Sequence, residues 1–281
     1  MTTIINGRQI AADLLFRLRR QVPLLTDQPK LVVLLVGDDP ASAIYVRRKH
    51  AAARSIGINA ATIHLPKDIE QDELMEHIHR LNADPEVKGI LIQLPLPMQI
   101  DTPQVMETVD PLKDVDGFHP LNVGRLASGT AYHQPCTPTG ILKLLHTMNV
   151  QLPSSQVLVI GCSSVVGQPT AILLTRAGAT VTLAHKLTFD LVAECQRAEV
   201  IITAAGCPGL VRGNHVRVDA VVIDVGINRV NGKIVGDVVF EECLGIARAI
   251  TPVPGGVGPM TVACLLENTI EATRLQRRRI G

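Results

Sequence analysis

Short apolar runs alternate with longer stretches of helical periodicity along most of the chain. The runs have the length of buried strands and are rich in Val, Ile and Leu. This alternation is typical of an α/β fold with mainly parallel sheets, because parallel strands are covered on both faces. We predict strands at 31–36, 90–94, 156–160, 179–183, 200–204 and 221–225, and helices at 7–22, 41–56, 71–81, 139–148, 165–177 and 259–274.

Two segments rich in Pro and Gly interrupt this pattern, at 110–137 and 251–261. Such composition without sustained periodicity is typical of loops at domain boundaries. We therefore predict two domains, with the first formed by residues 1–120 and the second by residues 121–254. Residues 255–281 should complete the first domain, because the last predicted helix is expected to return to it.

Composition and charge narrow the class of partner. Hydrophobic residues make up 46% of the 281 residues and charged residues 19%, as in a folded globular protein. A net charge of +1 gives no long-range attraction for a polyanion. Two tyrosines, four phenylalanines and no tryptophan are too few for a base-stacking platform. We therefore expect a small-molecule partner and no nucleic acid.

The cysteines and the apolar runs bear on the compartment. Six cysteines are scattered without a C-x-x-C pair, and no secretory signal precedes the predicted domains, so we expect a reducing cytoplasm. The longest apolar run, Leu31 to Val36, is far shorter than the roughly 20 residues that a membrane span needs. No membrane segment is expected, and no His or Cys spacing predicts a metal site.

A glycine turn follows the predicted strand at 156–160. Gly161 and Gly167 flank this turn, which leads directly into a predicted helix. Such a turn binds phosphate, because free backbone N–H groups and the helix dipole face the anion. Ser163 stands where a G-x-G-x-x-G pattern has its second glycine, so an ordinary strand-to-helix turn remains an alternative here.

The next predicted strand ends at His185 and Lys186, where dinucleotide-binding folds recognise the ribose. An NAD site would carry an acidic residue there, whereas a cation suits the additional 2′-phosphate of NADP. Lys186 therefore favours NADP, although a solvated loop lysine is an alternative at this point.

Tyr45 and Lys49 lie four positions apart on the predicted helix 41–56 and so share one face. A single helical lysine is usually solvated. Here Ala52 and Ala53 follow, and such small residues would let another element pack closely against the amine. A desolvated lysine loses affinity for its proton and can act as a base near neutral pH.

Two other segments could converge on this lysine. Gln93 interrupts an apolar run, and a buried glutamine needs hydrogen-bond partners. Asp114 and Asp116 lie near the predicted domain boundary, a common place for ligands to bind.

Motifs occur in one order along the whole chain. They are VGDDPASAIYVRRKHAAARSIGI (36–58), GILIQLPLP (89–97), KDVDGFHPLNVGRL (113–126), PCTPTG (135–140), GCSSVVGQP (161–169), VVIDVGIN (221–228) and TPVPGGVGPMTVA (251–263). Together they closely resemble the bifunctional methylenetetrahydrofolate dehydrogenase/cyclohydrolase family.

The resemblance implies an N-terminal α/β folate domain, completed by the C-terminal helix, and a Rossmann-like NADP domain, with a cleft between the two. It implies NADP-dependent oxidation of methylenetetrahydrofolate to methenyltetrahydrofolate, followed by hydrolysis to 10-formyltetrahydrofolate. Tetrahydrofolate derivatives would be the substrates. The resemblance also implies a homodimer formed through the cofactor domains, at or near a small hairpin that we predict at 232–240.

The resemblance assigns roles to individual residues. Lys49 would be the catalytic residue, with Gln93 positioning it and Tyr45 packing on the folate rings, and Asp116 would hold the pterin. Pro254, Gly255, Gly256 and Pro259 would line the folate site, and Gly161, Cys162, Ser163, Gly167, Lys186 and Ile227 would bind the cofactor.

One residue departs from the family pattern. Family members commonly carry an arginine at the position of Cys162, so a cation expected to bind the 2′-phosphate is missing. NAD therefore remains an alternative cofactor. The alternatives for the whole chain are another two-domain NADP oxidoreductase acting on a small acid and a catalytically weakened folate or nucleotide binder.

Overall fold

The computed structural model describes residues 1–280, apart from the side chains of Ala41 and Ile280, and divides the chain into two compact units. The large-sheet unit comprises residues 1–12 and 137–261. The small-sheet unit comprises residues 13–136 and the chain from residue 262 onward.

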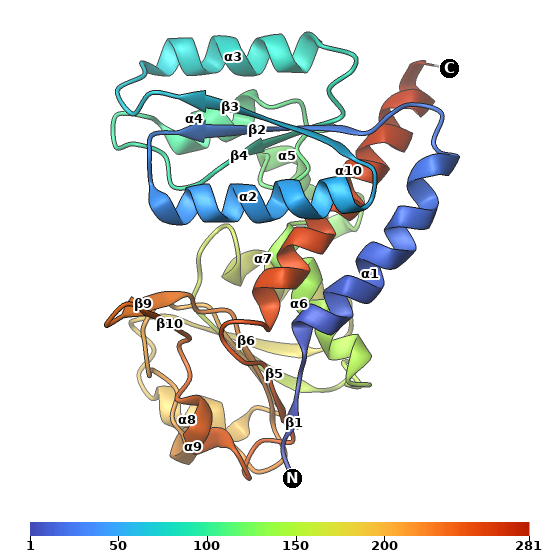
Figure 1. Ribbon diagram of the computed structural model, residues 1–281. Coiled ribbons are helices and arrows are strands. Elements are labelled where there is room, and N and C mark those ends of the chain that lie inside the picture. Colours follow the sequence, from blue (N-terminus) through green and yellow to red (C-terminus); the bar gives the residue numbers. More distant parts are fainter. Residues whose placement is uncertain (281) are drawn as a thin grey trace. The chain divides into compact units, whose positions relative to one another are not determined.

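The small sheet has the order β3-β2-β4 and is parallel throughout. Its central strand is buried along nearly its whole length, and α3 and α2 cover opposite faces of the sheet (Figure 1). Leu74 and Ile78 of α3 pack against Leu34 and Ile90 of the sheet. The elements that lie wholly in this unit are η1 (Val22–Leu24), β2 (Lys30–Val36), α2 (Pro40–Ser55), β3 (Asn59–Leu65), α3 (Gln71–Ala83), β4 (Gly89–Ile92), α4 (Thr102–Thr108) and α5 (Pro120–Ser128).

The large sheet has six parallel strands in the order β1-β11-β8-β7-β5-β6. The chain crosses from β5 to β6 in one direction and returns to β7 in the other, so right-handed crossovers place α7 and α8 on opposite faces. The elements are β1 (Thr3–Ile4), β5 (Gln156–Ile160), α7 (Gly167–Arg176), β6 (Thr180–Ala184), α8 (Leu191–Arg197), β7 (Val200–Thr203), η2 (Gly213–His215), β8 (Val221–Asp224), β9 (Asn228–Val230), β10 (Lys233–Val235), α9 (Phe240–Cys243) and β11 (Ala249–Ile250).

The structure confirms the α/β fold with parallel sheets, and every strand and helix predicted above is present, with the predicted bounds for β5 and with one or both ends shifted for the others. Three of the predicted helices contain a boundary between the units, and these are α1 (Gly7–Gln21), α6 (Cys136–Thr147) and the last, α10 (Val257–Ile280). The Pro- and Gly-rich segment at 251–261 is not a loop over its whole length, because α10 begins within it at Val257. The hairpin is formed by β9 and β10 and lies earlier than predicted. Its turn is Asn231-Gly232, where both residues have a positive φ.

The boundaries between the units differ from those predicted at 120/121 and 254/255. The chain passes between units at 136/137 and 261/262, and the first 12 residues belong with the large sheet. The reason at the N-terminus is that β1 pairs with β11. At the first boundary, Asn122 of α5 donates hydrogen bonds to Pro111 O and to the Asp114 carboxylate, which keeps α5 with the small sheet.

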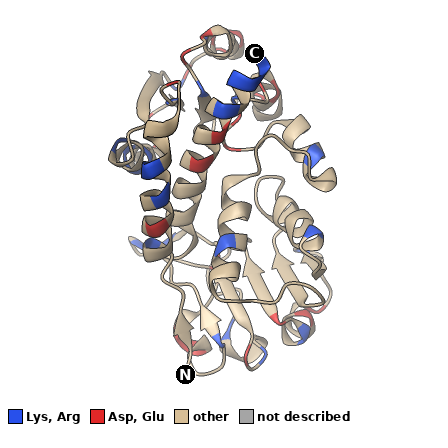
Figure 2. Ribbon diagram, turned by 90° about the vertical axis from the view of Figure 1, so that its right-hand side faces the viewer, with Lys and Arg blue, Asp and Glu red and all other residues tan. Residues whose placement is uncertain are grey.

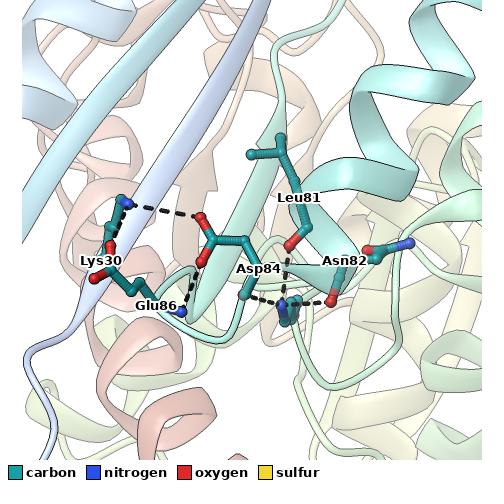
Figure 3. A network of polar contacts seen from close by, with 6 residues as sticks. Lys30, Leu81, Asn82, Asp84 and Glu86 are labelled. Atoms are coloured by element: carbon teal, nitrogen blue, oxygen red, sulfur yellow. Dashed lines mark hydrogen bonds and ion pairs between the residues drawn. The ribbon is translucent and has the colours of Figure 1, made fainter.

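A polar network closes the C-terminal end of α3. The buried Lys113 Nζ donates to the carbonyl oxygens of Leu81, Asn82 and Asp84 at 2.9, 2.7 and 2.8 Å. Lys30 lies 3.8 Å from the Asp84 carboxylate and 3.1 Å from that of Glu86 (Figure 3). These contacts satisfy carbonyls that α3 leaves without helical partners, and they anchor the start of the loop that carries Asp114 and Asp116.

Charged residues of both signs are distributed over the helices and loops, with basic residues in the last turn of α10 (Figure 2). The cations there suit the negative end of the helix dipole. In the part of the chain that the structure describes, no helix is long and apolar enough to cross a membrane.

Candidate active site

Lys49 and Gln93 are joined by a hydrogen bond in the small-sheet unit. Lys49 lies on α2 with only 8% of its surface exposed, and its Nζ donates to Gln93 Oε1 at 3.0 Å. Gln93 directly follows β4, where its backbone N–H donates to Leu34 O at 2.9 Å. Its side-chain Nε2 donates to Leu94 O at 2.7 Å. The partners that the sequence analysis expected for Gln93 are therefore present.

Tyr45 lies one turn before Lys49 on the same helix and is half-buried. The local sequence starts this helix firmly, because Pro40 occupies its first turn and the Asp39 carboxylate accepts from Ser42 N at 2.7 Å. Burial raises the pKa of Tyr45 above its ordinary value of 10.0, and Arg48 partly opposes this. The phenol is thus a neutral group that presents a ring face and a hydroxyl.

Asp114 organises the loop that carries Asp116. Its carboxylate accepts from the backbone N–H groups of Gly117, Phe118 and His119 at 3.1, 3.1 and 2.8 Å. A buried carboxylate with this many donors holds the chain in one conformation. Asp114 therefore stabilises the conformation of the loop, and these three backbone hydrogen bonds do not involve the Asp116 carboxylate.

Asp116 lies in the electrostatic field of Lys49. Burial raises the pKa of the Asp116 carboxyl above 3.8, the nearby Lys49 lowers it, and the like charge of Asp114 raises it. The neighbouring thiol of Cys136 also lowers it. The structure thus brings Lys49, Gln93 and Asp116 together, although they come from a helix, a strand end and a loop.

Two residues near Asp116 were not singled out from the sequence. Cys136 is fully buried, and its Sγ donates to Val115 O at 3.3 Å. Asn268 of α10 donates from Nδ2 to the same carbonyl at 2.9 Å. No local pattern marks these contacts, because Cys136 lies 21 positions and Asn268 153 positions from Val115 in the chain.

Gly161 and Gly167 form a close backbone turn in the large-sheet unit. Gly161 has φ +108°, and a Cβ there would lie 2.2 Å from Ala204 O. A Cβ on Gly167 would lie 1.8 Å from Gly161 O. Only glycine fits either position. The turn leads into the first residue of α7, whose dipole attracts anions, and this arrangement fits the pyrophosphate of a dinucleotide.

Cys162 and Ser163 are exposed within this turn. Ser163 Oγ accepts from the backbone N–H groups of Val166 and Gly167 at 3.2 and 3.4 Å, which stabilises the entry to α7. Ser163 therefore has a part in holding the turn in place of the glycine that the common pattern would carry.

Lys186 and Ile227 lie just beyond the carboxyl ends of β6 and β8, and both are exposed. Ligands of open parallel sheets bind at this edge. The turn at Lys186 is held by His185, whose Nδ1 accepts from Leu187 N at 3.2 Å. A lysine therefore lies at this edge of the sheet, two positions beyond the end of β6.

Two buried carboxylates hold the loops at the same edge. Asp224 accepts from Asp237 N and Val238 N at 3.0 and 2.9 Å. Asp237 accepts from Ala205 N and Cys207 N at 2.7 and 2.9 Å. Asp224, at the end of β8, thus serves as a carboxylate that caps nearby backbone N–H groups. Asp237 was missed because only the folded chain shows its donors.

The segment with Pro254, Gly255, Gly256 and Pro259 lies in the large-sheet unit. Gly255 has φ +117°, and its carbonyl accepts from Arg8 N at 3.1 Å. The segment is thus packed against the start of α1. Lys49, Gln93 and Asp116 belong to the other unit.

Among the described residues, no three His, Cys, Asp or Glu side chains are placed to hold a metal ion.

Known proteins match both units. The model of the tetrahydrofolate dehydrogenase/cyclohydrolase catalytic domain matches residues 5–116, and that of the NAD(P)-binding domain matches residues 135–277. The bifunctional protein FolD of Acidiphilium cryptum is 52% identical over 275 residues, which are 98% of this chain and 99% of that protein.

Solved structures agree over the full length. The bifunctional FolD enzyme of Campylobacter jejuni has a TM-score of 0.95 at 44% identity and covers 98% of this chain and 99% of its own. The enzyme of Trypanosoma brucei, solved with NADP cofactor and an inhibitor, has a TM-score of 0.94 at 35% identity, with 99% of each chain covered. These matches confirm the resemblance seen in the motifs, and the chain belongs to the tetrahydrofolate dehydrogenase/cyclohydrolase family.

Proposed function

We propose that this chain catalyses two consecutive reactions at one carbon of tetrahydrofolate. The first is the NADP-dependent oxidation of methylenetetrahydrofolate to methenyltetrahydrofolate, and the second is the hydrolysis of that product to 10-formyltetrahydrofolate. The observation that carries the proposal is the hydrogen bond between the buried Lys49 and Gln93, near Asp116, within the catalytic domain of this family.

In the first step the substrate must be held while its methylene bridge loses a hydride. NADP, when bound, accepts that hydride. Asp116 is suited to accept hydrogen bonds from the amino group and ring N–H of the pterin, since carboxylates pair well with such donors. The half-buried Tyr45 offers a ring face for the folate ring system. These contacts orient the reacting carbon.

In the second step water adds to the methenyl carbon and gives up a proton. Lys49 Nζ is held by Gln93 Oε1, so the rest of the amine can face the substrate. We assign proton removal to Lys49, which then returns a proton to the ring nitrogen as one carbon–nitrogen bond opens. The remaining hydroxyl proton is lost as the formyl C=O forms, so the step consumes one water and releases one proton.

Replacing Lys49 with Met tests this role. We expect cyclohydrolase activity to fall by about 10²- to 10⁴-fold, the typical contribution of a positioned acid–base group. Lys67→Met is the matched control, because Lys67 is an exposed lysine of the same unit. Hydrolysis of methenyltetrahydrofolate at the normal rate by the Lys49 variant would contradict the assignment.

We infer that NADP is preferred over NAD. The exposed Lys186 supplies a cation at the carboxyl end of β6, where the ribose of a dinucleotide would bind. The turn at Gly161 carries Cys162 in place of the arginine that is common in the family. Lys186 is then the main group that reads the 2′-phosphate, and NAD should be used less well. We also assign Pro254, Gly255, Gly256 and Pro259 to the folate site, because they belong to the family motif and because glycines, which lack a Cβ, let the backbone approach a ligand closely.

We also infer that the chain forms a homodimer in the cytoplasm. The hairpin of β9 and β10 exposes Val230 and Ile234, with 40% and 38% of their surfaces accessible, next to the exposed Ile227. Apolar side chains gathered on a short hairpin favour pairing with a second copy. The mass in solution, measured by sedimentation, tests this inference.

A further inference from the structure

We propose that Asn268 of α10 is a positioning residue that holds Asp116 in place to bind the pterin, an inference that rests on the proposed role of Asp116. The side-chain Nδ2 of Asn268 donates to Val115 O and to Gln134 O, each at 2.9 Å. The amide group has two N–H donors, so it can satisfy both carbonyls at once.

The first of these carbonyls belongs to the peptide group that precedes Asp116. Val115 O accepts from both Asn268 and the Cys136 thiol, the latter at 3.3 Å. Asn268 Nδ2 also lies 3.6 Å from Cys136 Sγ. On the other side of Asp116, its own carbonyl accepts from Cys136 N at 3.4 Å. Both peptide groups of Asp116 are therefore fixed by neighbours from other segments.

The second carbonyl belongs to a segment that lies directly against the Asp116 loop. A Cβ on Gly117 would lie 2.6 Å from Pro135 N and 2.7 Å from the carbonyl carbon of Gln134. The two loop segments, at residues 115–117 and 134–135, lie in close contact but do not pair as β-strands. Their backbone carbonyls therefore need other hydrogen-bond donors, such as a side chain. Asn268 provides these donors and sets the spacing between the two segments.

The Asp114 carboxylate fixes the loop after Asp116 by binding three consecutive N–H groups, from Gly117 to His119. Loss of Asn268 would leave that half of the loop intact. In the half that ends at Val115, the Val115 carbonyl would keep only the longer bond from the Cys136 thiol, at 3.3 Å. We therefore expect the Asp116 carboxylate to change its orientation while the loop stays folded.

The same helix contains a matched control. Gln276 Nε2 donates to Lys88 O at 2.7 Å and to Leu112 O at 3.3 Å. Gln276 therefore ties α10 to the same loop with the same chemical group, but at a point before Asp114. Its loss should weaken packing without moving Asp116.

The test compares Asn268→Ala, Asn268→Ser, Gln276→Ala and Asp116→Ala in the full-length enzyme. We expect Asn268→Ala to raise KM for methylenetetrahydrofolate about tenfold, with a smaller change in kcat and none in KM for NADP. Asn268→Ser keeps one donor and should restore part of the loss. Gln276→Ala should lower the melting temperature and leave both KM values unchanged.

A double-mutant cycle separates positioning from general stabilisation. In the Asp116→Ala background, Asn268→Ala should cause no further rise in KM. Equal effects of Asn268→Ala in both backgrounds, or a normal KM in Asn268→Ala, would overturn the positioning role while leaving Asp116 in place. A normal KM in Asp116→Ala would instead overturn the proposed role of Asp116, and this inference with it. If Asn268→Ala does not fold, the Ser variant is carried through the same cycle.

Discussion

Lys49 Nζ and Gln93 Oε1 lie 3.0 Å apart, although 44 positions separate the two residues in the chain. The orientation of the Gln93 amide is fixed from its other end, because Nε2 donates to Leu94 O at 2.7 Å. The oxygen must therefore face the lysine. Gln93 thus determines where the amine of Lys49 stands, and this relationship carries the proposed chemistry.

The first prediction concerns Gln93. Gln93→Ala removes the acceptor that holds Lys49, so we expect kcat for cyclohydrolase to fall by about 10²-fold through misplacement of the amine. Steady-state rates on methenyltetrahydrofolate measure it. Gln99→Ala is the control, since Gln99 follows the same strand but is exposed and donates to Lys67 O at 2.8 Å. If both variants lose activity equally, Gln93 has no special relation to Lys49.

The second prediction concerns acid pH. A protonated Asp116 cannot accept two hydrogen bonds from the pterin. KM for methylenetetrahydrofolate should therefore rise as pH falls through the pKa of this carboxyl. Burial raises that pKa above 3.8, so the rise should begin at a higher pH than for an exposed aspartate. An Asp116→Asn variant should have a flat KM profile over this range. A wild-type profile that stays flat down to pH 4 would contradict the prediction.

For the unliganded protein, the same pKa shift has the opposite consequence. A carboxyl with a raised pKa binds its proton more tightly in the folded chain than in the unfolded chain. The contribution of Asp116 to the free energy of unfolding is therefore fully present below 3.8 and is lost as pH rises through the raised pKa. Urea unfolding of wild type and Asp116→Asn across this range measures the difference.

The third prediction concerns the glycine turn. Gly161→Ala should abolish NADP binding and lower the free energy of unfolding by more than the roughly 1–3 kcal/mol of backbone strain alone, because its Cβ would lie 2.2 Å from Ala204 O. Gly245→Ala measures the cost of the backbone conformation without a steric clash, since Gly245 has φ +83° and no heavy atom lies within 4 Å of an added Cβ. Calorimetry with NADP and denaturant unfolding give both quantities. Normal NADP binding by Gly161→Ala would exclude this turn from the cofactor site.

The fourth prediction concerns cofactor choice. Lys186→Ala should raise KM for NADP about tenfold and leave KM for NAD nearly unchanged, because only NADP carries the 2′-phosphate that we propose Lys186 to contact. Arg197→Ala is the control, as Arg197 is an exposed cation of the same unit that pairs with Glu194. Equal changes for the two cofactors would show that Lys186 does not read the phosphate.

Much of the fold follows from local pattern. The apolar runs become buried strands, such as β2 and β5, because both faces of a parallel strand are covered. The sequence missed β3, whose residues are largely exposed and so show no apolar run. It also missed α5, which begins in a segment rich in Pro and Gly.

The sequence by itself determined the α/β class, the shared face of Tyr45 and Lys49, and the motifs of the family. These properties depend on spacing along the chain, which is visible before folding. Only the tertiary structure decided that Gln93 holds Lys49, that Asn268 reaches Val115, and that the unit boundary follows residue 136. Each of these depends on hydrogen bonds between distant segments, many of them to backbone carbonyls that every residue carries. Such partners leave no mark in the order of side chains.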